Sequence, residues 1–125
     1  MNRSPLILAG VAALMGAAGV GLAAAGVHAS GGELAERGAL FLLLHAVAAL
    51  AIAAFAGLPT APGRALVIVG FVMEAGATLF SAELAARAFT GDRIFPFAAP
   101  IGGSTMMLSW VALAVVFAVA AWRKD

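Results

Sequence analysis

The sequence predicts an all-α membrane protein in which four transmembrane helices pack as a small bundle, with both termini on the same side of the membrane. Of its 125 residues, 64% are hydrophobic and 10% are charged, which leaves too little polar surface to cover a water-soluble globule. A membrane-crossing helix needs about 20 apolar residues, and the chain has four such runs separated by short polar links. We therefore expect residues 1–125 to form a single transmembrane domain.

The predicted spans cover about 5–27, 34–56, 65–89 and 104–122. A secretory signal peptide is the competing interpretation of the first run, because Arg3 precedes it. That run is longer than the apolar core of a signal peptide, which has about 7 to 15 residues. We therefore expect it to remain as a membrane span.

One face of the first span carries small residues at helical spacing, namely Ala12, Gly16, Gly19, Ala23 and Gly26. In lipid, small side chains let helix backbones approach closely and gain dispersion contacts. An Ala- and Gly-rich sequence also produces such stripes by chance. We favour the interpretation that this face is a packing surface.

Links rich in glycine, proline and polar residues separate the spans. The first, 29–33, contains two glycines beside a serine and is typical of a turn. The second, 57–63, holds two prolines and two glycines that break a helix. The third is expected to begin at Thr90-Gly91 and to continue through a turn from Pro100 to Gly103 before the fourth span starts.

The distribution of positive residues predicts the orientation of the bundle. With an even number of spans, one side carries both termini and the second link, with the positive residues Arg3, Arg64, Arg123 and Lys124. The opposite side has Arg37 and Arg93, with Arg87 near the end of the third span. The positive-inside rule then places the termini in the cytoplasm or an equivalent matrix compartment. The Ala-rich, Cys-free composition favours a bacterial source, so the expected location is a bacterial inner (plasma) membrane.

An acidic residue, Glu74, lies in the middle of the third span and shares one helical stripe with Thr78 and Ser81, at i, i+4 and i+7. A carboxylate at that depth costs roughly 2.5 to 3.5 kcal/mol on insertion scales. The stripe is therefore expected to face protein or water rather than lipid. The other spans should pack around it.

His45 is expected to be the partner of Glu74. Each residue lies about nine residues inside its span, or roughly 13 Å deep, close to the midplane of the hydrocarbon. Because buried polar groups in lipid need partners, we expect a hydrogen bond or ion pair between them. As function, this pair predicts a proton relay or an acidic substrate site; as structure, it would hold the helix register.

Glu83 and Arg87 are four residues apart on the third span, with the acid first, which is the favourable order for an ion pair along a helix. They lie about half a helical circumference away from Glu74. We therefore expect a separate interfacial ion pair whose arginine reaches toward the headgroups. Trp122 is expected to anchor the last span at the interface, and Trp110 to pack deeper.

Several kinds of chemistry are not expected from this sequence. The chain has no cysteine, which excludes a thiolate metal site and a cysteine nucleophile. His28 and His45 are expected at different depths, a poor geometry for axial ligands of haem or for a metal site. No nucleophile with a base and an orienting group is identifiable, and no basic patch indicates nucleic acid. We therefore expect no enzymatic activity, no cofactor, no metal and no nucleic-acid partner.

Several short motifs together resemble those of one family, in the family's order. They are Gly21 to His28 in the first span, Phe41 to Ala46 in the second, Gly76 to Ser81 in the third, then Thr90-Gly91, Pro100 to Gly103 and Trp110. The set is similar to the small membrane family catalogued as domain of unknown function 423, which includes the transmembrane protein 256 group of mitochondria. The resemblance covers most of the chain.

The resemblance implies a four-span inner-membrane protein without an assigned reaction. The chain departs from the family where Phe41-Leu42 replaces Tyr-Gln and where 82–85 replaces a Gly-Ser-Leu-Tyr-like run. A polar site built on those side chains therefore does not transfer to this chain. The family-motif positions that transfer are His28, His45, Ser81, Pro100, Gly102 and Gly103.

From these observations we expect a structural or accessory protein of the lipid bilayer, which packs with itself as a homo-oligomer or with a larger membrane complex. The small-residue face of the first span motivates this hypothesis. The alternative is a proton-linked transporter or channel that uses the His45/Glu74 pair.

Overall fold

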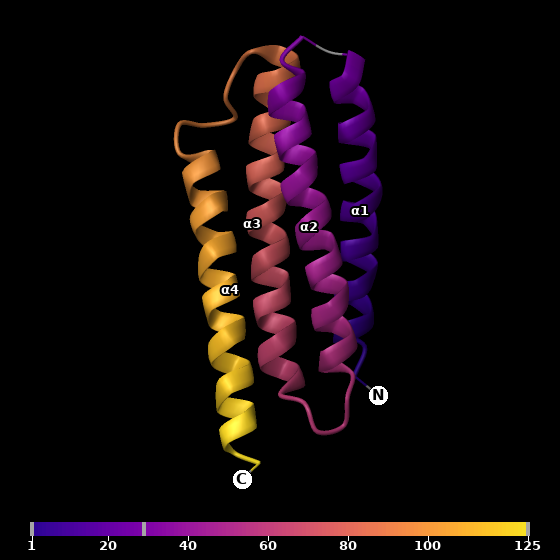
Figure 1. Cartoon of the computed structure of the whole chain (residues 1–125), viewed down its shortest axis with the longest axis vertical. Coiled ribbons are helices and arrows are strands. Elements are labelled where there is room, and N and C mark those ends of the chain that lie inside the picture. The colour runs from indigo at the N-terminus through magenta and orange to yellow at the C-terminus, as the bar shows by residue number, and fades with distance from the viewer. Residues whose placement is uncertain (1, 29, 125) are drawn as a thin grey trace.

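The computed structural model describes residues 2–28 and 30–124, so Met1, Asp125 and Ala29 of the first predicted link lie outside the described residues. Within those ranges the chain forms four α-helices, α1 (Ser4–His28), α2 (Gly32–Ala56), α3 (Gly63–Thr90) and α4 (Ala98–Trp122), which lie side by side (Figure 1). Each is long and apolar enough to cross a membrane. The predicted all-α architecture of four membrane-spanning helices is confirmed.

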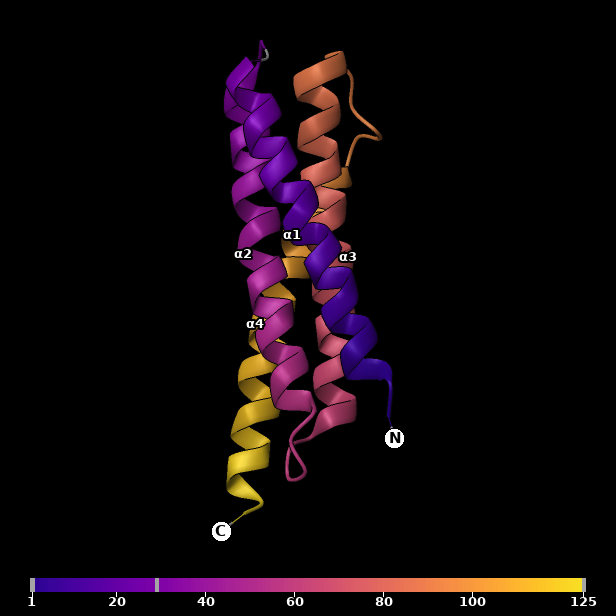
Figure 2. The ribbon, with the colours of Figure 1, turned by 90° about the vertical axis from the view of Figure 1, so that its right-hand side faces the viewer.

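The helices alternate in direction along the bundle. The start of α1, the α2–α3 link and the end of α4 lie at one end, drawn at the bottom of Figure 1, and the other two links lie at the opposite end. Figure 2 gives the same arrangement from the side. The end of α4 therefore lies near the link that precedes α3.

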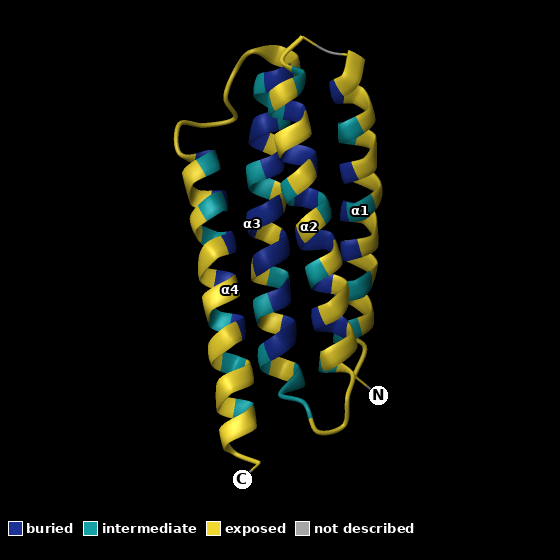
Figure 3. Ribbon diagram, in the orientation of Figure 1, coloured by how far each residue is buried: buried dark blue, intermediate teal, exposed yellow. Residues whose placement is uncertain are grey.

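The inner helices of the bundle are α2 and α3. α3 packs against each of the other helices, whereas the main contacts of α4 are with α3. Within the most apolar 18-residue stretch of each helix, the buried share is 39% in α2 and 44% in α3, but only 22% in α1 and 17% in α4 (Figure 3). The outer faces of α1 and α4 carry large apolar side chains such as Leu14 and Leu108, which suit contact with lipid.

The small-residue face of α1 packs inside the bundle. Gly19 and Gly26 are buried, and a Cβ added to Gly19 would lie 2.7 Å from Leu43 Cγ of α2. Near the other end of α1, Leu8 is fully buried against Gly70 of α3, where an added Cβ would lie 2.6 Å from Leu8 Cδ2. α1 thus crosses diagonally from α3 to α2 (Figure 2), and the predicted packing surface is directed at this chain's own α2.

Two link glycines have a backbone conformation that other residues rarely adopt. Gly31, before α2, has φ of 81°, and Gly91, after α3, has φ of 77°. The Gly91 N–H donates to the Arg87 carbonyl at 3.1 Å and so caps the last turn of α3. Glycine is favoured at both positions because it has no Cβ to clash at positive φ.

The start of α4 differs from the prediction. The helix begins at Ala98 rather than near Ser104, so the predicted turn from Pro100 to Gly103 is helical. Proline is tolerated in the first helical turn, where its missing N–H would have no partner. Gly102 is buried against α3, where an added Cβ would lie 2.7 Å from the Phe80 nitrogen and 2.8 Å from the Gly76 oxygen. Glycine there lets α4 touch the backbone of α3.

Candidate functional site

His45 connects α2 to α4. Its side chain is buried, with 2% exposed, and its Nδ1 lies 2.6 Å from the Phe41 carbonyl oxygen. Trp110 Nε1 donates to His45 Nε2 at 3.1 Å. Because indole is only a donor, Nε2 must be the acceptor, so Nδ1 carries the proton and donates to Phe41. This geometry corresponds to a neutral imidazole whose two nitrogens are both satisfied.

Aromatic rings surround this hydrogen-bonded histidine. Phe41 stacks on His45 at a centroid distance of 6.2 Å, and Trp110 meets the same ring edge-on at 6.0 Å. Phe80 of α3 packs edge-on against Phe41 at 5.1 Å. The cluster therefore joins α2, α3 and α4 around one polar contact, a geometry in which aromatic pairs add stability beyond buried area.

Glu74 is not the partner of His45, which corrects the predicted pair. The Glu74 side chain is 3% exposed, and neither carboxyl oxygen has a hydrogen-bond partner among the described residues. Glu74 lies on the flank of α3 near Val11 of α1, whereas His45 reaches Trp110 on α4. The two residues have similar depth in their helices but lie on opposite flanks of the bundle.

A lipid-facing groove runs along α3 next to Glu74, and we call it the α1–α3 groove. Its first part has a volume of about 510 Å³ and its second about 280 Å³. Thr78 and Ala82 line both parts, so the two adjoin along α3. The lining residues along α3 extend from Phe71 to Ala85, or about 21 Å of helix. The groove forms where α1 turns away from α3 toward α2 (Figure 2).

The other two residues of the predicted polar stripe behave differently. Ser81 is buried, with 2% exposed, and its hydroxyl donates to the Gly38 carbonyl of α2 at 2.8 Å. Thr78 is exposed and lines the α1–α3 groove. The predicted buried polar site is therefore only partly correct. Glu74, Thr78 and Ser81 all line the α1–α3 groove, whereas His45 belongs to the aromatic cluster.

The predicted ion pair between Glu83 and Arg87 does not form among the described residues. The salt bridge found there joins Arg37 and Glu33 of α2 at 2.9 Å. Glu83 is 1% exposed, and its Oε2 accepts the Ile94 backbone N–H at 2.7 Å. A helix-interior carboxylate that bonds a link amide holds the α3–α4 link against α3. The residue acts on the link rather than on its helical neighbour.

The sequence predicts that Trp110 packs inside the bundle, without indicating a hydrogen-bond partner, and it predicts no role for Gly38. Trp110 could have been paired with His45 from the general rule that buried indole N–H groups find a partner. Gly38 carried no such signal, because glycines are frequent throughout the chain. Its neighbours Leu22, Leu84 and Ser81 would all lie within 3.4 Å of an added Cβ.

The remaining family-motif positions lie outside the aromatic cluster and the Ser81 contact. His28 is the last residue of α1 and is exposed. Pro100 lies in the first turn of α4, Gly102 is buried against α3, and Gly103 is only partly buried. None of these four residues lines the α1–α3 groove.

The comparisons with known proteins agree with this architecture. No solved structure matches the chain. The chain matches the family described as Protein of unknown function (DUF423) over residues 15–103. That range includes the motif positions from His28 to Gly103, whereas Trp110 lies beyond it. Four helices that can cross a membrane, and this match over most of its length, identify the chain as an integral, multi-pass membrane protein that belongs to the DUF423 family.

Proposed function

We propose that this chain is an accessory membrane protein that associates laterally with another transmembrane helix, from a second copy or a larger complex, through the α1–α3 groove. The observation that supports this function is the Glu74 carboxyl, which is buried beside that groove and lacks a hydrogen-bond donor among the described residues. The small-residue face of α1 no longer supports it, because Gly19 and Gly26 pack within the chain.

The energetics favour a donor supplied from outside the chain. A buried polar group without a partner costs about 1–3 kcal/mol, and more if it is charged. In lipid no water is available to reduce this cost. Both Glu74 oxygens are closed to the surface of the isolated chain, so the side chain must turn toward the groove when a second helix brings a hydroxyl, amide or indole N–H. The new hydrogen bond then removes the penalty, and the carboxyl favours the assembled state over the monomer.

The shape of the groove suits a helix. On α3 the side chains of Ala75, Thr78 and Ala82 are exposed and line the groove. Small residues at this spacing let a second helix approach the backbone closely. The Thr78 hydroxyl lies one turn beyond Glu74, where it can add a further interhelical hydrogen bond.

The association can be tested with substitutions that separate folding from assembly. Glu74→Leu replaces an unsatisfied polar group by an apolar one of similar size, so it should keep or raise bundle stability while weakening association about tenfold or more. Ala82→Leu fills the groove and should weaken association without touching Glu74. Ala51→Leu, on the exposed face of α2, is the matched control and should assemble as the parent does.

Assembly is measured by photobleaching of singly labelled protein in liposomes at decreasing protein-to-lipid ratio, and by co-purification from native membranes in mild detergent. The proposal fails if the parent is monomeric at every ratio and co-purifies with nothing. It also fails if Glu74→Leu and Ala82→Leu assemble as well as Ala51→Leu.

We propose further that both termini face the cytoplasm of a bacterial inner membrane. This orientation is supported by the positive residues Arg3, Arg64, Arg123 and Lys124 at the end that carries the termini. Because the chain has no cysteine, Thr60→Cys and Asp92→Cys each create a single labelling site in opposite links. A membrane-impermeant maleimide should label Asp92→Cys in intact spheroplasts and Thr60→Cys only after permeabilisation. The reverse pattern would refute the orientation.

The alternative function, proton-linked transport, required His45 and Glu74 to exchange a proton. Both ring nitrogens of His45 are instead engaged by Trp110 and Phe41. We therefore favour the accessory function. Proton flux in proteoliposomes that Glu74→Gln abolishes would overturn this preference.

A further inference from the structure

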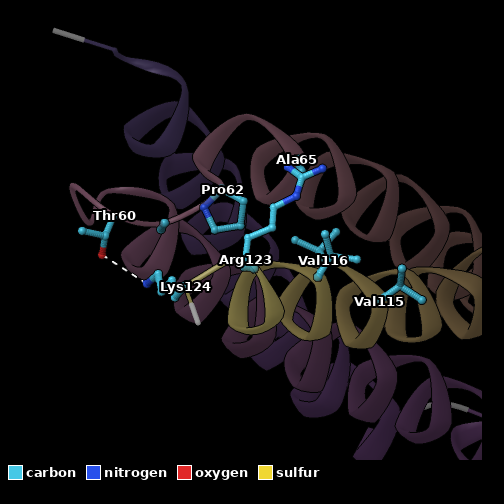
Figure 4. A pocket seen from close by; sticks show the side chains of 10 residues that line it. Thr60, Pro62, Ala65, Val115, Val116, Arg123 and Lys124 are labelled. Carbon is cyan, nitrogen blue, oxygen red and sulfur yellow. Dashed lines mark hydrogen bonds between the residues drawn. The ribbon is translucent and has the colours of Figure 1, made fainter.

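A second groove lies at the other side of the bundle, between the α2–α3 link and the last turns of α4 (Figure 4). Its volume is about 400 Å³. Val115, Val116 and Val119 of α4 form one wall, and Pro62 and Ala65 at the start of α3 form the other. The interior of this groove is almost entirely apolar.

The mouth of the groove is positively charged. Arg123 and Lys124 line it, and in Figure 4 the Arg123 side chain extends from α4 toward Ala65. Lys124 Nζ lies 3.4 Å from the Thr60 hydroxyl. Neither basic residue forms a salt bridge within residues 2–28 and 30–124.

The backbone adds to the positive charge at this point. α3 begins at Gly63 after Pro62, and no side chain caps its first amides. The N-terminal end of a helix carries a partial positive charge that favours anions. Two cationic side chains and an uncapped helix start therefore meet at the same rim.

The position of the groove relates the charged mouth to the membrane. Arg123 and Lys124 follow directly after α4 ends at Trp122, which is 86% exposed and suits the headgroup region. From Arg123 down to Val115 the groove extends along α4 for roughly 12 Å. Its mouth thus lies at headgroup level and its apolar part lies in the hydrocarbon.

We propose that this groove binds one anionic phospholipid, with the phosphate near Arg123, Lys124 and the Thr60 hydroxyl and one acyl chain along the valine wall. A soluble phosphate would leave the valine wall unused, and a zwitterionic lipid has no net charge to match the mouth. The proposal is independent of the α1–α3 groove, because the two grooves share no lining residue.

Native mass spectrometry of the full chain, purified in mild detergent, tests the proposal with phosphatidylglycerol and phosphatidylcholine as probes. One phosphatidylglycerol should be retained and phosphatidylcholine should not. Each basic residue near an anionic lipid surface contributes about 1 kcal/mol, so the double variant Arg123→Gln/Lys124→Gln should weaken retention roughly thirtyfold. Arg37→Gln/Arg93→Gln, at the opposite end of the bundle, is the matched control.

A second variant keeps the two positive charges and removes the space for the acyl chain of the lipid. Val119→Trp narrows the apolar groove and should reduce retention at least fivefold, and glycerol phosphate should not displace the lipid. Equal retention of the two lipids, or parent-like retention by the double variant, would refute the site. If glycerol phosphate displaced the bound lipid as well as free phosphatidylglycerol does, the groove would be only a surface anion site, and the proposal would be overturned.

Discussion

Replacing Gly102 by alanine tests whether α4 is held against α3 by direct backbone contact. The added Cβ would lie 2.7 Å from the Phe80 nitrogen and 2.8 Å from the Gly76 oxygen. Both are backbone atoms of α3, so no side chain can rotate away to make room. The expected result is that α4 moves outward and loses packing along the crossing.

Gly103→Ala is the matched control, in the next residue of the same helix. Its Cβ would meet Phe80 Cδ2 at 3.9 Å, an ordinary van der Waals contact. Both substitutions gain roughly 0.8–1.0 kcal/mol of helix propensity, and only Gly102→Ala adds an overpacking cost of about 1–3 kcal/mol. Gly102→Ala should therefore be less stable than Gly103→Ala by about 1–3 kcal/mol.

The free energy of unfolding is measured by SDS titration from mild detergent. Trp110 fluorescence in a Trp122→Phe background reports on α4, because Trp110 donates to His45 across the bundle. If Gly102→Ala fails to fold while Gly103→Ala folds, this outcome also supports the close crossing, because it corresponds to a large loss of stability. If the two variants agree within about 0.5 kcal/mol, the close crossing of α3 and α4 is refuted.

Substitutions at three further residues test the polar contacts, and helical circular dichroism during SDS titration measures the effect of the first two on stability. Trp110→Phe removes the N–H that satisfies His45 and should lower the free energy of unfolding by about 1–3 kcal/mol; an unchanged value would refute the neutral, doubly bonded histidine. Ser81→Ala removes one interhelical hydrogen bond and should cost about 0.6 kcal/mol, and a gain in stability would contradict its role. Glu83→Ala frees the Ile94 amide and should speed its hydrogen exchange at least tenfold, whereas Glu83→Gln should retain protection; equal exchange in both would refute the contact.

The first three predicted spans agree with α1, α2 and α3 to within two residues at each end, and the reason is local. In a membrane each helix must satisfy its own backbone hydrogen bonds, so apolar length and glycine-rich links are sufficient to locate it. The packing face of α1 was predictable on the same basis, since the spacing of Gly19 and Gly26 within one helix defines a face. The start of α4 was not, because Pro100, Gly102 and Gly103 favour a turn locally, whereas in the structure they lie in a helix that packs Gly102 against the α3 backbone.

The sequence alone determined the class of this protein, the number of its helices and their alternating direction, because these follow from composition and from the length of each apolar run. Only the tertiary structure decided which polar groups meet. His45 bonds Trp110 rather than Glu74, and Glu83 bonds the α3–α4 link rather than Arg87. The rotation of each helix about its axis and its offset from its neighbours set these partners, and both depend on packing between helices that are distant in the chain.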